Sequence, residues 1–420
     1  MMIWIGVAII GVAIYFLAKQ YETRMVLFTA GFLMAVVAGD PLVAFKSFSH
    51  AMGEYKLFET IVTVMGFSMV MKLTKCDQHL IHFMAKPVQK AGPLLIPAAT
   101  FVTFFINSTL TSAAGSAAAA GAILIPLLLS SGVHPAVAAA AVLAGTFGSM
   151  FNPGYAMNAL TASVAKASPV AVVANHFVPL LIVCTVVALT LGILAYVRKE
   201  NKGWAPTEEI TEEIEEFKVS YLKALVPIVP LILILIASAK VVPALKDLAI
   251  SHTMIIGSFI AFLVSRVNPG KITKEFFHGI GEAYGHICGI IICALVFVDG
   301  MKALGMLKAL TDAMITHPEI AKFSTGFGPY LLGVISGSGD AATLAFNSSI
   351  TPHAAQFGFG IVELGDQAFL AGAFGHSMSP VAGAAIVLAG LAKINPIELT
   401  KRNFIPMVAA TITSMFIMLG

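Results

Sequence analysis

The sequence carries little charge for its length. Only 11% of its 420 residues are Asp, Glu, Lys or Arg, 58% are apolar, and the mean hydropathy is +0.90. Soluble domains carry about a quarter charged residues. No charged residue occurs from Ala91 to Ala165, and a membrane span needs about 20 apolar residues. The composition therefore excludes an ordinary soluble domain and predicts several membrane-crossing helices.

Cysteine pairs and catalytic motifs are also scarce. The four cysteines form no CxxC pair, which argues against a disulfide framework or a zinc site. The chain has no HExxH and no P-loop, so we expect no enzyme and no ATP-driven pump. The run Gly337-Ser338-Gly339 lacks the strand–turn–helix context of a nucleophile elbow. The small net charge of +3 gives no reason to expect a nucleic-acid partner.

Apolar runs between charged or Gly/Pro positions predict the helices. The N-terminal run has no basic segment before it and no cleavage site, so we expect a retained first span. Two predicted spans are broken, at Met150–Gly154 and at His376–Pro380, because proline and glycine do not continue a helix. The predicted spans are 2–18, 25–40, 57–74, 135–165, 176–197, 219–239, 250–265, 276–298, 364–392 and 403–420.

Two further segments combine short apolar arms with a polar tip. Residues 93–131 surround the tip Asn107–Ser112, and residues 323–358 surround the tip Ser336–Asp340. Each pattern is typical of a re-entrant hairpin, which is tolerated only where protein or a water-filled cavity covers its backbone. Amphipathic runs at 76–90 and 301–316 predict interfacial helices. The acidic run within 198–217 predicts a solvated connector.

The two halves of the chain resemble each other. Leu143–Gly148 recurs as Leu370–Gly375, and at the same offset Pro153 matches Pro380. Each half is expected to have five full crossings, an odd number, so the repeats are predicted to be inverted. Placing both termini outside leaves seventeen of the 25 Lys and Arg residues on the cytoplasmic side, as the positive-inside rule requires.

The two tips and the two helix breaks should meet near the midplane of the bilayer. Half-helix N-termini suit carboxylates, while hydroxyls and unwound carbonyls suit Na⁺ or a proton. Any single hydroxyl could instead bond to its own backbone. The predicted substrate-binding residues are Asn107, Ser108, Thr109, Thr111, Ser112, Asn152, Ser336, Gly337, Ser338, Gly339, His376, Ser377 and Ser379, with Asn158 and Thr343 nearby.

Asp340 is the only charged residue between Lys322 and Glu363. A charge at the bilayer centre costs about 2.5–3.5 kcal/mol on insertion scales. Asp340 is therefore predicted to bind a coupling cation or carry a proton, together with Asn107, Asn152 and Ser377, with a sodium ion near Asn107 and Asp340. The alternative is a carboxyl that is held neutral or is satisfied by hairpin N–H groups. His376 could donate to a substrate carboxylate, or be a hydrogen-bonded core residue.

These motifs resemble those of the DcuC-type anaerobic C4-dicarboxylate carriers, within the ion-transporter superfamily that includes the divalent-anion/sodium symporters. The resemblance is carried by Ser336–Ala341, by Ser379–Gly383 and by Ala389–Pro396, and the order of elements extends it over essentially the whole chain. It implies a homodimer in the bacterial inner membrane and an elevator-like movement of a transport domain against a scaffold. Members of the family often carry Asn where this chain has Asp340 and Arg where it has His376, so this site is less positive.

The predicted fold is an all-α polytopic membrane protein of two inverted repeats, each with five spans and one hairpin. Expected scaffold helices are 1–75 and 219–300, transport-domain segments are 76–198 and 301–420, and a cytoplasmic linker covers 199–218. The predicted function is secondary transport of small carboxylates, first succinate, fumarate or malate, by exchange or with Na⁺ or H⁺. An amino-acid or monocarboxylate carrier is the alternative within transport, and a channel is a less favoured class.

Overall fold

The computed structural model describes residues 2–205, 217–240 and 242–420. All regular elements among these residues are helical. Most of the acidic run that predicts the connector, at 206–216, lies outside the described residues. The polytopic, all-helical fold class is therefore confirmed for the described part of the chain.

The first half contains ten α-helices, counted over the described residues. A short 3-10 helix, Gly148–Phe151, lies between α8 and α9. The helices are α1 Met2–Ala18, α2 Thr23–Val37, α3 Leu42–Ala51, α4 Tyr55–Thr74, α5 Cys76–Ala85, α6 Leu95–Thr109, α7 Ala113–Ser130, α8 Pro135–Ala144, α9 Ala156–Ala165 and α10 Pro169–Val197.

The second half begins with a short helix and then follows a similar order. A π-helical turn, Tyr284–Cys288, joins α14 to α15, and a 3-10 helix, Thr351–Phe357, follows α18. The helices are α11 Tyr221–Leu225, α12 Val229–Ser238, α13 Ile250–Ser265, α14 Pro269–Ala283, α15 Gly289–Ala303, α16 Met306–Thr316, α17 Pro318–Ser336, α18 Gly339–Ser349, α19 Ile361–His376, α20 Gly383–Leu391 and α21 Pro396–Met418.

Seven helical segments of the described chain are long and apolar enough to cross a membrane, and the bent pair α20–α21 gives up to eight. Three shorter apolar helices, α1, α2 and α13, add to these. Both arms of the first predicted hairpin reach this length, at Gly92–Thr109 and Ala113–Ser130. The prediction that these arms are short for a full span is therefore wrong, because both arms are as long as a membrane span. In the second hairpin, α18 has only 11 residues.

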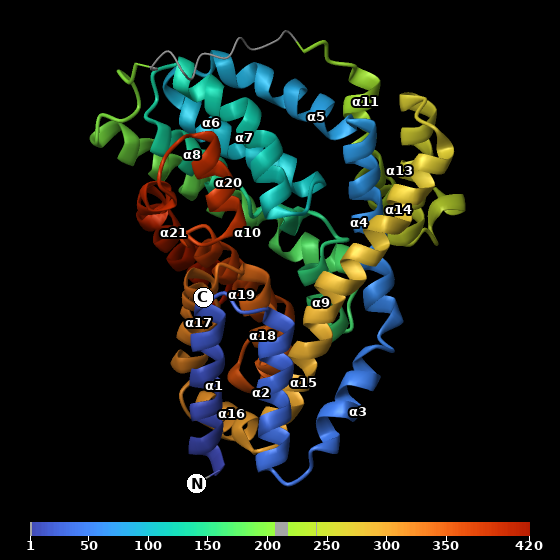
Figure 1. Ribbon diagram of the computed structural model, residues 1–420, viewed down its shortest axis with the longest axis vertical. Helices are drawn as coiled ribbons and strands as arrows, with labels where there is room; N and C mark the ends of the chain where they lie inside the picture. Colours follow the sequence, from blue (N-terminus) through green and yellow to red (C-terminus); the bar gives the residue numbers. More distant parts are fainter. Residues whose placement is uncertain (1, 206–216, 241) are drawn as a thin grey trace.

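Two long helical paths run side by side along the molecule (Figure 1). One consists of α3 followed by α4, and the other of α14 followed by α15 in the opposite direction; α4 packs on α14, and α3 on α15. The sequence analysis missed α3 and began the second path seven residues late, at 276 instead of 269. The cause is that Lys46, His50, Lys271 and Lys274 interrupt the apolar pattern.

Proline and small polar residues fix several helix starts. Proline is the first residue of α8, α10, α14 and α21, where its missing N–H costs nothing. The residue before it accepts a hydrogen bond from the first turn in each case. The capping residues are His134, Ser168, Asn268 and Asn395.

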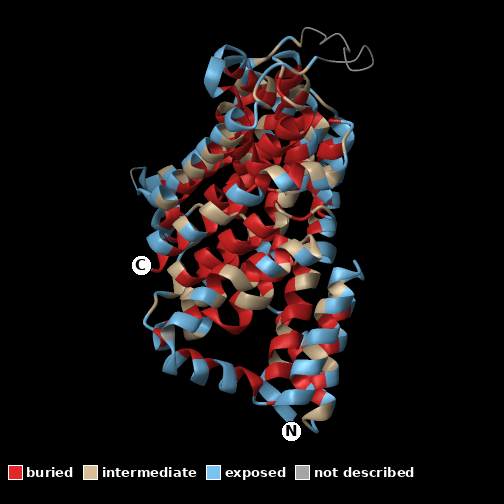
Figure 2. Ribbon diagram, turned by 90° about the vertical axis from the view of Figure 1, so that its left-hand side faces the viewer, coloured by how far each residue is buried: buried red, intermediate tan, exposed pale blue. Residues whose placement is uncertain are grey.

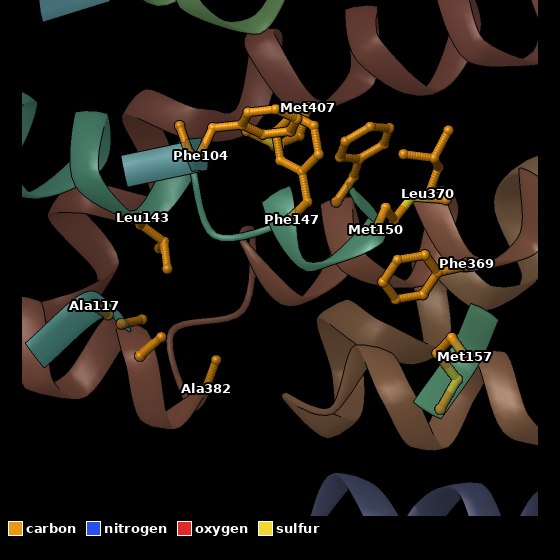
Figure 3. Close-up of a cluster of buried hydrophobic side chains, with 14 of the residues drawn as sticks. Phe104, Ala117, Leu143, Phe147, Met150, Met157, Phe369, Leu370, Ala382 and Met407 are labelled. Carbon is orange, nitrogen blue, oxygen red and sulfur yellow. The ribbon is translucent and has the colours of Figure 1, made fainter. Parts of the chain in front are cut away.

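Buried residues concentrate in the middle of the molecule (Figure 2), and every residue of α8 is buried. Phe104, Phe147 and Phe374 form a chain of edge-to-face rings, with centroids 5.0 and 5.3 Å apart. This aromatic cluster joins helices from both halves, with Met150 and Met407 beside it (Figure 3). Edge-to-face aromatic pairs contribute about 0.5–1.5 kcal/mol beyond burial.

Glycines bring each hairpin into backbone contact with its broken helix. A Cβ at Gly148 would clash with the Phe104 carbonyl oxygen, and one at Gly375 would clash with the Tyr330 carbonyl oxygen. No side chain fits at either position without moving the backbone of the hairpin arm.

Gly148→Ala and Gly375→Ala should each lower the free energy of unfolding by about 1–3 kcal/mol, because overpacking displaces backbone. The matched control is Gly281→Ala on α14, where nothing lies within 4 Å of the added Cβ. Thermal unfolding of the detergent-solubilised protein measures the effect. Equal unfolding temperatures for Gly148→Ala and Gly281→Ala would contradict this packing.

Candidate functional site

The first tip is the turn between α6 and α7. The Ser112 hydroxyl caps α7 by accepting from the Gly115 N–H at 3.2 Å. Asn107 is fully buried and uses all of its polar groups: its NH₂ donates to the Leu110 carbonyl and the Ser116 hydroxyl, both at 3.0 Å. Its Oδ1 accepts from the Ser149 N–H at 2.7 Å. Asn107 therefore ties the tip to the first helix break.

The first helix break, between α8 and α9, bonds back to the same tip. The Asn152 NH₂ donates to the Ser108 carbonyl at 3.0 Å, and its Oδ1 accepts from the Gly154 N–H at 2.9 Å. The Asn158 NH₂ donates to the Met150 and Asn152 carbonyls at 2.7 and 2.9 Å. These amides replace the backbone partners that the interrupted helix has lost.

The second tip, between α17 and α18, is built on glycine and serine. Gly337 has a φ of +68°, which favours glycine, and the Ser338 hydroxyl caps α18 by accepting from the Ala341 N–H at 3.2 Å. His376, at the second helix break, places Nδ1 2.9 Å from the Gly337 carbonyl oxygen. Each break thus contacts its own tip through a side chain.

A hydrogen bond between two cavities joins the two halves of the chain. The Tyr155 hydroxyl, directly before α9, donates to Asp340 Oδ1 at the start of α18, with a separation of 2.5 Å. The two residues are 185 positions apart in the sequence. The bond therefore connects the first helix break to the second tip.

Two cavities meet at this bond. A cavity of about 300 Å³ is lined by Thr111, Ser112 and Ala113 of the first tip and by Tyr155 and Asp340. A second cavity, of about 110 Å³, lies toward the second tip. Its lining includes Ala113, Tyr155, Gly337, Ser338, Gly339, Asp340 and His376. Asp340 is the only Asp, Glu, Lys or Arg among the residues that line either cavity.

The predicted residues divide between cavity and framework. Thr111, Ser112, Asp340, His376 and the Gly337–Gly339 run line one of the two cavities. The other predicted residues line neither cavity. Three of them are buried in the protein: Asn107, Ser377 and Ser379. A separate space of about 10 Å³ is lined by Ser108, Thr109 and Asn152, and another of about 30 Å³ is lined by Ser336. The Ser108 and Thr109 hydroxyls donate to carbonyls of their own helix. This is the alternative to ligand binding that the sequence left open for any single hydroxyl.

Sequence reasoning missed Tyr155, Asp366 and the role of His176. Tyr155 directly follows Asn-Pro-Gly, and this position at a break is the signal that could have identified it. Asp366 lies close to Glu363 in the first turns of α19, and it is 1% exposed. His176 Nδ1 lies 2.7 Å from Asp366 Oδ2. His176 lies in the second turn of α10 and is fully buried.

The apolar helices define a multi-pass membrane protein with a partly polar internal site. The family model described as "DcuC: C4-dicarboxylate anaerobic carrier" matches residues 42–420, and the chain belongs to this family. A protein of Haemophilus influenzae named as an uncharacterized transporter is 37% identical over 272 residues, which cover 63% of this chain and 98% of the relative. The Escherichia coli K12 anaerobic C4-dicarboxylate transporter DcuC is 25% identical over 435 residues, covering 97% and 93%. The expected resemblance is confirmed, and the family is one of transporters, not enzymes.

Asn107→Ala should destabilise the protein by about 1–3 kcal/mol, because it leaves the buried Ser149 N–H without its acceptor. Ser130→Ala is the matched control on the same hairpin, since the exposed Ser130 hydroxyl bonds only to the Leu127 carbonyl. Thermal unfolding should separate the two variants clearly. Indistinguishable unfolding temperatures would show that the Asn107 contacts contribute little.

Proposed function

We propose that the protein is a secondary transporter of small carboxylates, with C4-dicarboxylates such as succinate, fumarate and malate as the first substrates to test. The observation that carries this proposal is the pair of cavities between the two hairpin tips. A carboxylate in the larger cavity would face the first turn of α7, where the N–H groups and the helix dipole favour an anion. The family name and the named activity of the Escherichia coli relative support the same substrate class.

The charge of the site bears on the substrate and on coupling. Neither cavity is lined by Lys or Arg, and Asp340 lies between them. A dianionic substrate beside an ionised carboxylate is repelled unless a cation or a proton neutralises one of them. We therefore propose that transport is coupled to Na⁺ or H⁺ through Asp340, with Asn107, Asn152 and Ser377 forming the framework of the ion site. An amino acid or a monocarboxylate is the alternative substrate, because each carries less negative charge.

Paired contacts support an inverted repeat. Gly148 and Gly375, in equivalent positions of the two halves, both touch the carbonyl of an aromatic residue in the preceding hairpin. The long helical paths also pair crosswise: α2 packs on α15, while α13 packs on α4. Such exchanged partners are expected when two similar halves are related by a pseudo-two-fold axis in the membrane plane.

We further propose the division of labour that the family resemblance implies. Residues 1–75 and 219–300 form a scaffold, and residues 76–198 and 301–420 form a transport domain that carries hairpins 93–131 and 323–358. The protein works as a homodimer in the bacterial inner membrane, with both termini outside, and moves its substrate by an elevator mechanism. A channel would need a continuous pore, whereas this proposal places a closed site between two tips.

Purified protein in liposomes loaded with unlabelled succinate should accumulate labelled succinate by counterflow. The exchange should saturate and should be inhibited by fumarate and malate, because one site binds all three. Empty liposomes and liposomes with unlabelled sulfate inside are the controls. Uptake of a labelled amino acid or monocarboxylate without succinate uptake would replace the C4-dicarboxylate proposal with its alternative. Large single-channel currents would support a channel instead.

Asp340→Asn and Tyr155→Phe should both change the Na⁺ or pH dependence of counterflow, since the first removes the carboxylate charge and the second removes the hydroxyl that donates to it. Asp312→Asn, at an exposed position of α16, is the matched control for the loss of a carboxylate. The measurement is counterflow at several Na⁺ concentrations and pH values. If the ion and pH dependence of Asp340→Asn equals that of Asp312→Asn, Asp340 has no coupling role.

A further inference from the structure

A buried histidine–carboxylate pair lies outside the two cavities. His176 on α10 is 0% exposed and Asp366 on α19 is 1% exposed, and they are 190 positions apart in the sequence. His176 Nδ1 is 2.7 Å from Asp366 Oδ2, and its Nε2 is 3.0 Å from the Met150 carbonyl oxygen. The imidazole therefore bridges the second half of the chain to the first helix break.

Both ring nitrogens face oxygen atoms, which fixes the number of protons. A carbonyl can only accept, so Nε2 must carry a hydrogen. At Nδ1, either the imidazole donates to an ionised Asp366, or a protonated Asp366 donates to the imidazole. In both arrangements the pair holds one more proton than a neutral imidazole with a carboxylate. Removing that proton leaves two lone pairs facing each other.

The other half of the protein makes the same contact without a titratable pair. Asn403 is equivalent to His176, and its NH₂ donates to the Ser377 carbonyl at 3.3 Å; Ser377 is equivalent to Met150. The position equivalent to Asp366 is the buried Ala139. An amide is thus sufficient to satisfy a carbonyl at a helix break, so the proton of the His176–Asp366 pair is an addition to that structural role.

We propose that His176 and Asp366 form a proton-binding site, and that its proton holds the first helix break in the position required for transport. The transport part of this inference rests on the proposed function. The Met150 carbonyl that His176 contacts also accepts from Asn158, which in turn contacts the Asn152 carbonyl. Loss of the proton therefore weakens the network that positions Asn152 against the first tip.

Several of the elements around the pair carry no ionisable side chain. Among the elements packed on α10 and α19, α6, α8, α9 and the 3-10 helix at 148–151 carry no Asp, Glu, Lys, Arg or His. Glu363 is a like charge that acts on Asp366. The remaining ionisable groups are His376 at the end of α19, Glu319, Lys322 and Tyr330 of α17, Asp340 of α18, His353, and Glu398, Lys401 and Arg402 of α21. Of these, Glu398 is paired with Lys401 and Arg402.

Asp366→Asn gives the sharpest test. In this variant the amide can donate to Nδ1 of a neutral imidazole while Nε2 still donates to Met150, so both contacts persist without the extra proton. The wild-type protein should lose thermal stability and counterflow as the pH rises from about 6 to about 9, because the folded state must give up its bound proton. The activity and thermal stability of Asp366→Asn should instead stay constant as the pH rises from neutral to about 9.

A second variant follows the arrangement in the other half. His176→Asn combined with Asp366→Ala reproduces the residues at Asn403 and Ala139, and it too should have a flat profile. The controls are Asp312→Asn and the exposed His278→Asn, both of which should keep the wild-type decline. A decline that persists in Asp366→Asn or in the double variant would overturn the proton site, as would a flat wild-type profile. Thermal unfolding against pH gives this answer even if no carboxylate is transported, so the two proposals can fail separately.

Discussion

The structure depends on satisfying the backbone groups of two interrupted helices inside an apolar protein. Each break frees N–H and carbonyl groups that water cannot reach, and an unpaired buried polar group costs about 1–3 kcal/mol. Side-chain amides and an imidazole supply the missing partners. Asn107, Asn152, Asn158 and His176 do this at the first break, and Asn403 does it at the second, while His376 contacts a carbonyl of the second tip. Polar residues with framework roles therefore surround the cavities, and a polar residue near a break is not by itself a ligand.

This constraint explains how far the sequence could lead. The breaks were predictable because Asn-Pro-Gly and Ser-Pro cannot continue a helix, and the hairpin tips because polar clusters interrupt long apolar runs. The tip residues Thr111 and Ser112 line the same cavity as Asp340. What the sequence could not separate was a hydroxyl facing a cavity from one bonded to its own helix, as at Ser108 and Thr109. Both have the same local pattern.

Contacts between distant parts of the chain set the other limit. Tyr155 and Asp340 are 185 positions apart, and His176 and Asp366 are 190 apart. The sequence predicts that tips and breaks meet, but a single sequence does not identify which individual residues pair. The helix α3 was missed for a different reason, since its lysine and histidine lie on a partly exposed helix whose mean apolarity is low. Apolar runs identify helices that are apolar all round, and they are a poor guide to half-exposed ones.

The glycines at 148 and 375 have a mechanical consequence. Where backbone touches backbone, no side chain lies between the two segments to change rotamer and absorb a displacement. Each hairpin arm and its broken helix must then move together as one rigid unit, because they cannot slide past each other. Any rearrangement that exposes the cavities has to occur at weaker contacts. The hydrogen bond between Tyr155 and Asp340 is one of these, because only one hydroxyl has to lose its partner.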